Sequence, residues 1–345
     1  MAINTEINLP DGAGGFNAYH PETNINQIIG LRREPSTAYA LGDIRYINAL
    51  DKAKLVVVKA GTTGSGDLTL SSTADGTLIT DGTVVWIVDS LADGNYTAAH
   101  QNGIAGGADL TAYWESGHMS TNIQAGKFVG MHIGDYITKS VTANGSTYSN
   151  VKWLLGAFDP HIHCGDTETT AHHVLLIPDS TLQRNVAMNA SNTTAGGYVG
   201  SAMWTSRIPG WATGIKNAFG SDHVLKHREL LSNAINSSAA SAAGAGWTGT
   251  ANNWAWVDVE VNIPNENMVY GKAFASSGFD QGDFPRMLPL YALKCGHLDD
   301  RSWFWLRSVA SSSSFCCASC NGDAGGGSAS TSAAHGGVRP YFLLR

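Results

Sequence analysis

Histidines between positions 161 and 173 are the residues best suited to metal chemistry. The segment His161–Asp166 (HIHCGD) is followed closely by His172 and His173. In a strand, His161 and His163 would share one face, because side chains alternate between faces. Zn²⁺ accepts imidazole, thiolate and carboxylate ligands, and three chains on a common axis would offer six imidazoles to one octahedral ion. The competing interpretation, which we favour, is hydrogen bonding within a loop, so we assign no metal and no cofactor and keep His161 and His163 as the candidate ligands.

The cysteines offer a second possible chemistry. They are Cys164, Cys295, Cys316, Cys317 and Cys320. Their number is odd and the N-terminus shows no secretory signal, so we expect reduced thiols rather than a disulfide framework. Cys317 and Cys320 have C-x-x-C spacing, but a redox or zinc role needs a helix N-terminus or a second ligand pair. The Ser- and Gly-rich surroundings predict neither, and we interpret the spacing as accidental.

Carboxylates near the histidines are the third possibility. A pair of them can hydrolyse a glycosidic bond, and Asp159, Asp166 and Glu168 are the nearest acids. None of the three lies in a recognisable motif, and loop or turn positions explain them better. The chain also has no nucleophile elbow, no HExxH and no phosphate-binding glycine loop. We therefore expect no enzymatic activity.

Low charge and abundant glycine distinguish the composition. The 345 residues include 21 Lys and Arg against 28 Asp and Glu, a net charge of −7. Charged residues reach 14%, against about 25% in average soluble domains. Hydrophobic residues at 43% argue against wholesale disorder. An acidic balance without basic clusters argues against nucleic acid as a partner, and no apolar run approaches the roughly 20 residues of a membrane-spanning helix. The 40 glycines indicate β structure with long ordered loops, unlike most cytosolic enzymes.

The sequence pattern divides the chain into four stretches. Residues 1–50 have little core of their own, and we expect them to serve attachment or oligomerisation. Residues 51–90 predict a small all-β module, because short β-rich runs are split by Asp-Gly hairpin signals. Residues 91–127 form a Gly-rich connector, and residues 128–345 form the largest domain. The fold class is α+β and mostly β.

Strands and one clear helix must position the candidate residues. Residues 203–219 predict the helix, because Ile208, Trp211, Ile215 and Phe219 share a face. Residues 237–253 are small and predict a loop. Strands are expected at residues 54–60, 68–71, 77–79, 83–88, 134–137, 151–158, 173–177, 268–274, 303–309 and 338–344.

Two apolar segments enclose a low-complexity tract near residue 345. Residues 301–308 are RSWFWLRS and residues 336–344 are GGVRPYFLL, while Ser, Ala, Gly and Cys dominate residues 311–335. Composition alone is compatible with a flexible loop. A bland linker is not normally held between two apolar strands, so we favour an ordered surface loop.

The enclosing motif W-x-W-L-R-S … G-V-R-P resembles the C-type lectin-like domain of variable proteins targeted by diversity-generating retroelements, and of related phage tail proteins. The resemblance covers roughly residues 128–345. It implies a C-terminal C-type lectin-like fold with a variable region at about residues 308–337. Further segments similar to phage tail or fibre proteins are Ala108–Thr111, Met131–Tyr136, His172–Asp179, Gly196–Ser201, Ala218–Ser221 and His227–Leu231.

The tract has the composition that such a retroelement would leave. The resemblance implies mutation of adenines, and the favoured template codon AAC can become codons for Asn, Ser, Thr, Asp, Gly, Ala, Cys, His and Phe. It cannot become codons for Lys, Met, Gln, Glu or Trp. Every residue from Ser311 to Gly337 lies in the reachable set. Cys316, Cys317, Cys320 and His335 are less expected in a simple linker.

The resemblance implies a division between displayed and framing side chains. The positions expected to face a ligand are Ser308, Ala310, Ser312, Cys317, Cys320, Asn321, Asp323, Gly325, Gly326, Gly327, Ser328, Thr331 and His335. The framing positions are Trp303, Trp305, Leu306, Arg307, Val338, Arg339 and Pro340. We expect Arg307 and Arg339 to bind loop carbonyls or carboxylates inside the domain. Phe315 is the tract's one aromatic residue of the Phe, Tyr and Trp class, so binding anchors are few and we expect weak affinity per site, raised by multivalency in a homotrimer.

The function implied by the resemblance is that of a phage or prophage tail receptor-binding protein, made in the bacterial cytoplasm and carried on the virion. The expected partners are a host-cell surface receptor, protein or glycan, and other phage tail proteins, with no nucleic acid and no membrane insertion. The lectin-like label implies neither sugar nor calcium, because Ca²⁺ needs several clustered oxygen ligands and the tract offers only Asn321 and Asp323. The alternatives are a tail-associated glycan hydrolase, and a structural virion decoration or bacterial surface adhesin.

Overall fold

The computed structural model describes residues 32–47, 53–240, 248–276, 286–293, 302–331 and 336–345, and the backbone of two short strands before them. These strands, β1 (Ile7–Pro10) and β2 (Phe16–Tyr19), pair antiparallel. The fold is mostly β, with 38% strand and 17% helix, which confirms the predicted class of α+β and mostly β. The chain forms two compact units, Met1–Asn95 and Tyr96–Arg345. About half of the predicted attachment segment, and His335, lie outside the described residues.

The N-terminal unit is built on an antiparallel sheet of order β4-β5-β8-β7, with β3 and β6 forming a separate pair. The strands are β3 (Ala38–Tyr39), β4 (Ile44–Tyr46), β5 (Lys54–Lys59), β6 (Gly61–Thr62), β7 (Leu78–Asp81) and β8 (Val84–Val88). The strands predicted at 54–60, 77–79 and 83–88 are confirmed within a residue or two. Residues 68–71 form no strand.

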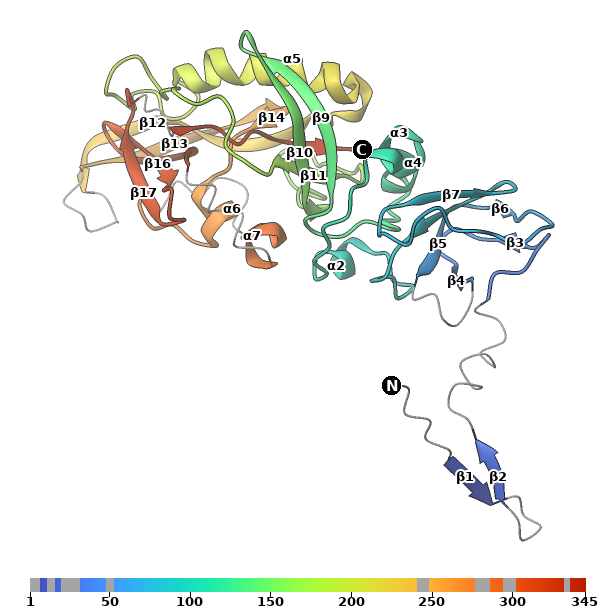
Figure 1. The fold of residues 1–345 in the computed structure, drawn as a ribbon. Helices are drawn as coiled ribbons and strands as arrows, with labels where there is room; N and C mark the ends of the chain where they lie inside the picture. The colour runs from blue at the N-terminus through green and yellow to red at the C-terminus, as the bar shows by residue number, and fades with distance from the viewer. Residues whose placement is uncertain are drawn as a thin grey trace. The chain divides into compact units, whose positions relative to one another are not determined.

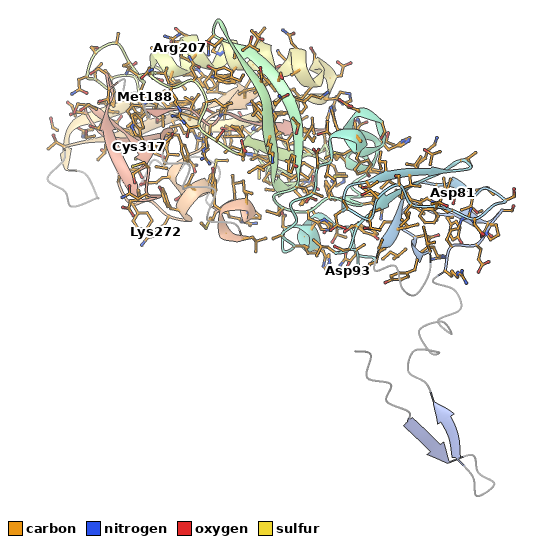
Figure 2. All side chains as sticks on the ribbon, viewed as in Figure 1. Asp81, Asp93, Met188, Arg207, Lys272 and Cys317 are labelled. Atoms are coloured by element: carbon orange, nitrogen blue, oxygen red, sulfur yellow. The ribbon has the colours of Figure 1, made fainter. Side chains whose placement is uncertain are left out.

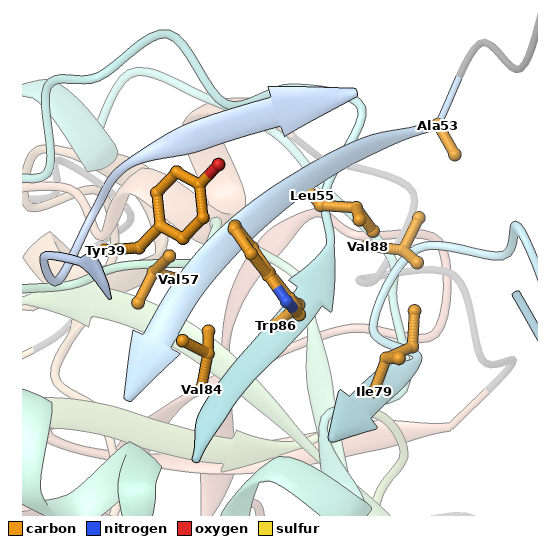
Figure 3. Packing of buried hydrophobic residues seen from close by; sticks show 8 residues of the cluster. All are labelled: Tyr39, Ala53, Leu55, Val57, Ile79, Val84, Trp86 and Val88. Atoms are coloured by element: carbon orange, nitrogen blue, oxygen red, sulfur yellow. The ribbon is translucent and has the colours of Figure 1, made fainter. Parts of the chain in front are cut away.

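Trp86 is the centre of the core of the N-terminal unit. Its ring is fully buried and meets Tyr39 edge-on, with ring centroids 5.1 Å apart. Leu55, Val57 and Val84 pack in the same cluster (Figure 3). Burying an aromatic side chain of this size is among the largest single contributions to a small core, so this sheet has a core of its own.

A buried ion pair closes the N-terminal unit. The Arg33 guanidinium donates to the two carboxylate oxygens of Asp81, at 2.9 and 2.7 Å, and to the carbonyls of Gly64 and Gly66. Trp86 Nε1 donates to Asp81 Oδ2 at 3.2 Å. Buried charges are tolerated when they are paired and hydrogen-bonded, and this pair ties the segment before β3 to the end of β7.

A five-stranded antiparallel sheet organises the C-terminal unit. Its order is β14-β19-β11-β10-β9, so the last strand of the chain lies between β14 and β11. The strands are β9 (Tyr136–Ala143), β10 (Ser146–Phe158), β11 (Val174–Pro178), β14 (Val261–Asn262) and β19 (Tyr341–Leu344). β11 and β19 are buried along their whole length, as expected of central strands covered on both faces. They correspond to the strands predicted at 173–177 and 338–344.

Helix α5 (Ile208–Phe219), preceded by the π-helical turn Met203–Arg207, packs on this sheet (Figure 1). Phe219 meets the ring of Trp153 on β10 at 5.8 Å and that of Phe342 on β19 at 4.9 Å between centroids. The four residues of the predicted apolar face are all buried. The structure therefore confirms the predicted helix, and it confirms that the predicted apolar face packs against the core.

Three short helices occupy the stretch that the sequence predicts to be a connector. They are α2 (Ala98–Gln101), α3 (Thr111–Glu115) and α4 (His118–Gln124), and they belong to the C-terminal unit. Gly117 separates α3 from α4 with a φ of 74°, a left-handed conformation that glycine adopts without strain. Tyr113 and Ile123 are fully buried, so this stretch adds to the core instead of only linking two domains.

A second sheet, of order β17-β16-β15-β18, and a long hairpin of β12 and β13 complete the C-terminal unit. The elements are β12 (His227–Ala240), β13 (Thr248–Val259), β15 (Trp303–Ser311), β16 (Ser314–Ala318), β17 (Ala324–Ser328), β18 (Gly336–Gly337), α6 (Glu266–Tyr270), α7 (Pro289–Leu293) and the 3-10 turn Ser221–His223. None of the helices in the described ranges is long and apolar enough to cross a bilayer.

Two predictions for this unit are wrong. Much of the loop predicted at 237–253 belongs to the hairpin, because β12 extends to Ala240 and β13 starts at Thr248. The strand predicted at 268–274 is instead the end of α6 and the residues after it. Asn265 starts that helix by accepting a hydrogen bond from the Met268 N–H at 2.8 Å, a side-chain cap that local apolar composition does not reveal.

Candidate functional site

The first segment that encloses the tract lies in the core. Trp305 on β15 is fully buried, and its Nε1 donates to the carbonyl of Val186 at 2.8 Å. Trp303 meets Trp305 edge-on at 4.8 Å between centroids, and Leu306 is fully buried. A buried indole with its N–H satisfied is held in one orientation, so this end of β15 has the rigidity that a frame requires.

Gly336 on the second segment fits tightly against the first. β18 runs parallel to β15 and brings Gly336 opposite Trp303. A Cβ at Gly336 would lie 2.0 Å from the indole ring of Trp303. At Gly337 a Cβ would lie 2.3 Å from the carbonyl oxygen of Leu182. Gly337 therefore requires glycine, because the clash is with backbone, whereas a side chain at Gly336 would force the Trp303 ring to move.

The G-V-R-P residues that follow are buried as well. Val338 exchanges two backbone hydrogen bonds with Leu182, at 2.8 and 2.9 Å. Arg339 is 1% exposed, and its guanidinium lies 4.7 Å from the centroid of the Phe304 ring, within range of a cation–π interaction. Pro340 is also buried. Contacts inside the domain thus fix the positions of the two enclosing segments.

Arg307 is the charged member of this frame. Its Nη1 donates to Glu229 Oε2 and, at 2.9 Å, to the hydroxyl of Tyr341. The Glu229 carboxylate also accepts from the Tyr341 hydroxyl at 2.5 Å, from His227 Nε2 at 2.7 Å and from Asn262 Nδ2 at 2.7 Å, and all five residues are buried. Burial raises the pKa of Glu229, but Arg307 and His227 outweigh it and hold this pKa well below its ordinary value. The carboxylate therefore stays ionised inside the domain.

The hairpin β16–β17 carries the most exposed part of the tract. Its turn is fixed by backbone bonds, with the Ser319 N–H donating to Asp323 O at 2.8 Å and the Gly322 N–H to Ser319 O at 3.0 Å. Gly322 has a φ of 85°, which favours glycine. Cys320, Asn321 and Asp323 are exposed. The turn is thus ordered by its own backbone, while these side chains face solvent.

Positions along β17 differ in the space they leave for a side chain. A Cβ at Gly325 would lie 3.6 Å from Cys317 Sγ, an ordinary contact. A Cβ at Gly327 would lie 2.8 Å from Cη2 of the buried Trp305 ring. Gly325 can therefore vary at little cost, whereas variation at Gly327 requires the Trp305 ring to shift, and we no longer count Gly327 among the freely variable positions.

Two other expected display positions are buried. Ser308 is 1% exposed, and its Oγ accepts a hydrogen bond from the Glu266 N–H at 3.1 Å. Ala310 is fully buried. Both lie on β15, which is covered along its length after Trp303, and we remove them from the candidate ligand surface. The positions that are at least partly exposed are Ser312, Cys317, Cys320, Asn321, Asp323, Gly325, Gly326, Gly327, Ser328 and Thr331.

Cys317 lacks the properties of a reactive thiol. The four described cysteines are free thiols, and Cys317 lies on β16 in the C-terminal unit (Figure 2). Burial, and then the nearby Glu266 carboxylate, raises the pKa of Cys317 to about 11. The thiolate is the form that attacks disulfides and binds metals, so Cys317 is not an activated sulfur at neutral pH.

His161 and His163 lie in different surroundings. Residues 159–164 form turns, not the strand that would align their side chains, and His163 has a φ of 59°. The His163 side chain is 69% exposed and pairs with Glu168. His161 is fully buried, and its ring centroid lies 4.5 Å from that of His227 on β12. The expected shared face is therefore wrong, and the imidazole next to His161 comes from a distant part of the sequence.

The three carboxylates considered for glycosidase chemistry each have another partner. Asp159 pairs with His172 at 2.7 Å, and Asp166 accepts two hydrogen bonds from Arg228 at 2.7 and 2.9 Å. Glu168 pairs with the exposed His163. Each of the three acids thus has a structural partner, and the Asp159 side chain is also nearly buried.

Comparison of the chain with protein-family models, with curated protein sequences and with solved structures gave no match. The chemistry of the sites themselves is therefore the basis for inferring function. Two sites are defined by the geometry: an exposed hairpin on a buried frame, and a buried polar cluster around Glu229.

Glu229, Asn262 and Tyr341 are not among the residues that the sequence singles out. One signal was available, because His227 and Glu229 are two residues apart and alternation along a strand places them on one face. The groups that bind Glu229 from other strands are between 33 and 112 residues away in the sequence. A single sequence carries no local sign of such contacts.

Proposed function

We propose that this chain is a receptor-binding protein of a phage or prophage tail, and that the hairpin β16–β17 displays diversified residues that bind a host-cell surface ligand. The observation that carries the proposal is a contrast within the tract region. The side chains of β15 after Trp303 are buried, whereas Cys320, Asn321 and Asp323 in the adjoining turn are exposed.

A binding surface that changes from one variant to the next needs a scaffold that the changes do not disturb. The turn of residues 319–323 supports such a role, because backbone hydrogen bonds fix it and most side chains can be replaced without losing those bonds. The frame behind it is held by Trp305 and Arg307, whose partners lie inside the domain. Ligand contacts and structural contacts are thus made by different residues.

The C-type lectin-like fold is part of the same proposal. Its support is the entry of the last strand, β19, into the middle of the main sheet, and the second sheet, whose strands all precede β19 in the sequence. The short or polar side chains of the hairpin offer few anchors for a ligand. A homotrimer would present three such surfaces, and multivalency would compensate for weak single contacts.

Sequencing of this gene from many related phage or prophage isolates tests the proposal. We expect the differences to concentrate at adenine-derived codons of exposed positions such as Asn321, Asp323 and Gly325. Ser308, Ala310 and Gly327 should stay constant, because they are buried or lie against Trp305. Differences spread evenly along the chain would overturn the proposal and favour a structural virion role.

A labelling experiment tests the surface directly. Cys320 is exposed, so a bulky maleimide should react there and block binding of the purified chain to cells of the bacterial host. The Cys320→Ser variant, treated identically, should keep its binding. Equal binding by the labelled wild-type chain and the treated variant would exclude this hairpin as the contact surface.

A further inference from the structure

Three buried side chains from two segments converge inside the C-terminal unit. His161 lies in the turn after β10, and His227 and Glu229 lie on β12. One imidazole nitrogen from each histidine and one carboxylate oxygen lie within 4.8 Å of one another. The exposed fractions of the three residues are 0%, 3% and 0%, so the cluster is separated from bulk water.

We propose that His161, His227 and Glu229 form a binding site for a divalent transition-metal ion, with Zn²⁺ as the expected occupant. Two imidazoles and one carboxylate are a ligand set that Zn²⁺ uses in proteins, at bond lengths of about 2.0–2.2 Å. The ligand atoms would close on the ion to reach those lengths. A tetrahedral ion would complete its shell with one further ligand such as a water molecule.

The ring of His227 is oriented as a metal-binding histidine. Its Nδ1 lies 3.4 Å from the carbonyl oxygen of Leu225. Nδ1 therefore faces a hydrogen-bond acceptor, and Nε2, which lies 2.7 Å from Glu229 Oε1, is the ring nitrogen that an ion at this site would contact. Hydrogen bonding of the distal ring nitrogen to a carbonyl is the usual way in which proteins fix the tautomer of a histidine ligand.

His161 brings the second imidazole to the site. Its ring centroid lies 4.5 Å from that of His227, and both rings are buried.

The neighbours of Glu229 leave one oxygen directed at the site. Arg307 and Asn262 both donate to Oε2. Oε1 accepts from the Tyr341 hydroxyl at 2.5 Å and from His227 Nε2 at 2.7 Å. Since a carboxylate oxygen has two lone pairs, Tyr341 can keep one while the ion takes the other. The positive charge of Arg307 lowers the affinity for a cation. Arg307 contacts Oε2, however, and not the Oε1 atom that would bind the ion.

An ion at this site would lie between His227 Nε2 and Glu229 Oε1, which are 2.7 Å apart. The bound ion would link strand β12 to the turn that follows β10. It would lie next to the hydrogen bond between Arg307 and Glu229.

Metal titration of the full-length chain, after removal of bound metal by a chelator, tests the proposal. Co²⁺ is the spectroscopic probe, and Zn²⁺ competes it away. We expect one Co²⁺ per chain, visible absorption from nitrogen and oxygen ligands, and a higher Tm in the presence of Zn²⁺. In His161→Gln the affinity should fall by about tenfold or more. His163→Gln, which changes an exposed histidine in the same turn, should leave affinity and Tm shift unchanged.

Three results would overturn the proposal. One is the absence of Co²⁺ or Zn²⁺ binding by the wild-type chain. Another is equal affinity in the wild type and in a folded His161→Gln variant. The third is a thiolate-to-metal band in the near ultraviolet that disappears in Cys320→Ser, because the ion would then be bound by cysteine. The spectral test and the titration of the wild-type chain need no substitution in the core, so either can still overturn the proposal if His161→Gln fails to fold.

Discussion

The buried ring of Trp305 fills the space that a side chain at Gly327 would need: a Cβ at Gly327 would lie 2.8 Å from Cη2 of the indole. Trp305 is held by its hydrogen bond to Val186 and has no exposed surface. Gly327 is part of β17, in the middle of the tract expected to vary. Core packing thus reaches into the displayed hairpin at this position and limits which residues can be diversified.

Gly327→Ser should destabilise the C-terminal unit, and Gly325→Ser should not. Overpacking against a fixed ring costs about 1–3 kcal/mol, whereas a partly exposed position with ordinary contacts changes stability by about 0.5 kcal/mol or less. The measurement is urea unfolding of both variants beside the wild type. Equal stability of the two variants would show that the Trp305 ring adapts freely.

Trp305→Ala should cost roughly 3–5 kcal/mol of unfolding free energy, because it removes a fully buried aromatic side chain. It also leaves the Val186 carbonyl without its indole donor. Asp323→Ala, at an exposed turn position, is the matched control and should leave the melting temperature nearly unchanged. If Asp323→Ala unfolds the domain as well, the turn is part of the core. The proposal that it displays ligand-binding residues would then be wrong.

Arg307→Met should destabilise the domain by about 3–5 kcal/mol, because Glu229 would stay buried without its cation. Tyr341→Phe removes one hydrogen bond to the same carboxylate and should cost less, about 1.5–3 kcal/mol. Thermal and urea unfolding measure both effects. The double variant Glu229→Gln with Arg307→Met should lose less than the sum of the single changes, and simple additivity would contradict the pairing.

Acidification should weaken the N-terminal unit through Asp81. Burial raises the pKa of this carboxyl, but hydrogen bonds from Arg33, from the Gly64 N–H and from Trp86 outweigh it, and the pKa lies below its ordinary value. The stabilisation is therefore complete above the unfolded pKa of about 3.9 and is lost as the pH falls through the lower folded value.

Hydrogen exchange of the peptide containing β7 and β8, corrected for the intrinsic rate at each pH, reports on this unit separately. We expect protection to fall below about pH 4 in the wild type. Asp81→Asn should be less protected at pH 7 and should lack this acid-dependent loss. An unchanged acid-dependent loss in Asp81→Asn would assign it to other groups.

The strands and the longest helix could be predicted because their signals are local. β5, β8, β11 and β15 are apolar runs bounded by turn residues, and α5 shows the helical period in four buried residues. The expected strand at 268–274 failed because Asn265 caps a helix there. The short helices within residues 91–127 were not predicted, because their periodicity is weak although they contribute buried side chains.

By itself the sequence determined the mostly β class, the C-terminal frame with its buried Trp305, and the tract that the frame encloses. These follow from composition and from periodicity within a few residues. Only the tertiary structure decided that Ser308 and Ala310 are buried and that Gly327 lies against the core. It also decided that His161 lies beside His227 and Glu229 and does not share a face with His163. The physical reason is that burial and side-chain contact depend on strands far apart in the chain, and a single sequence records each strand but not its neighbours.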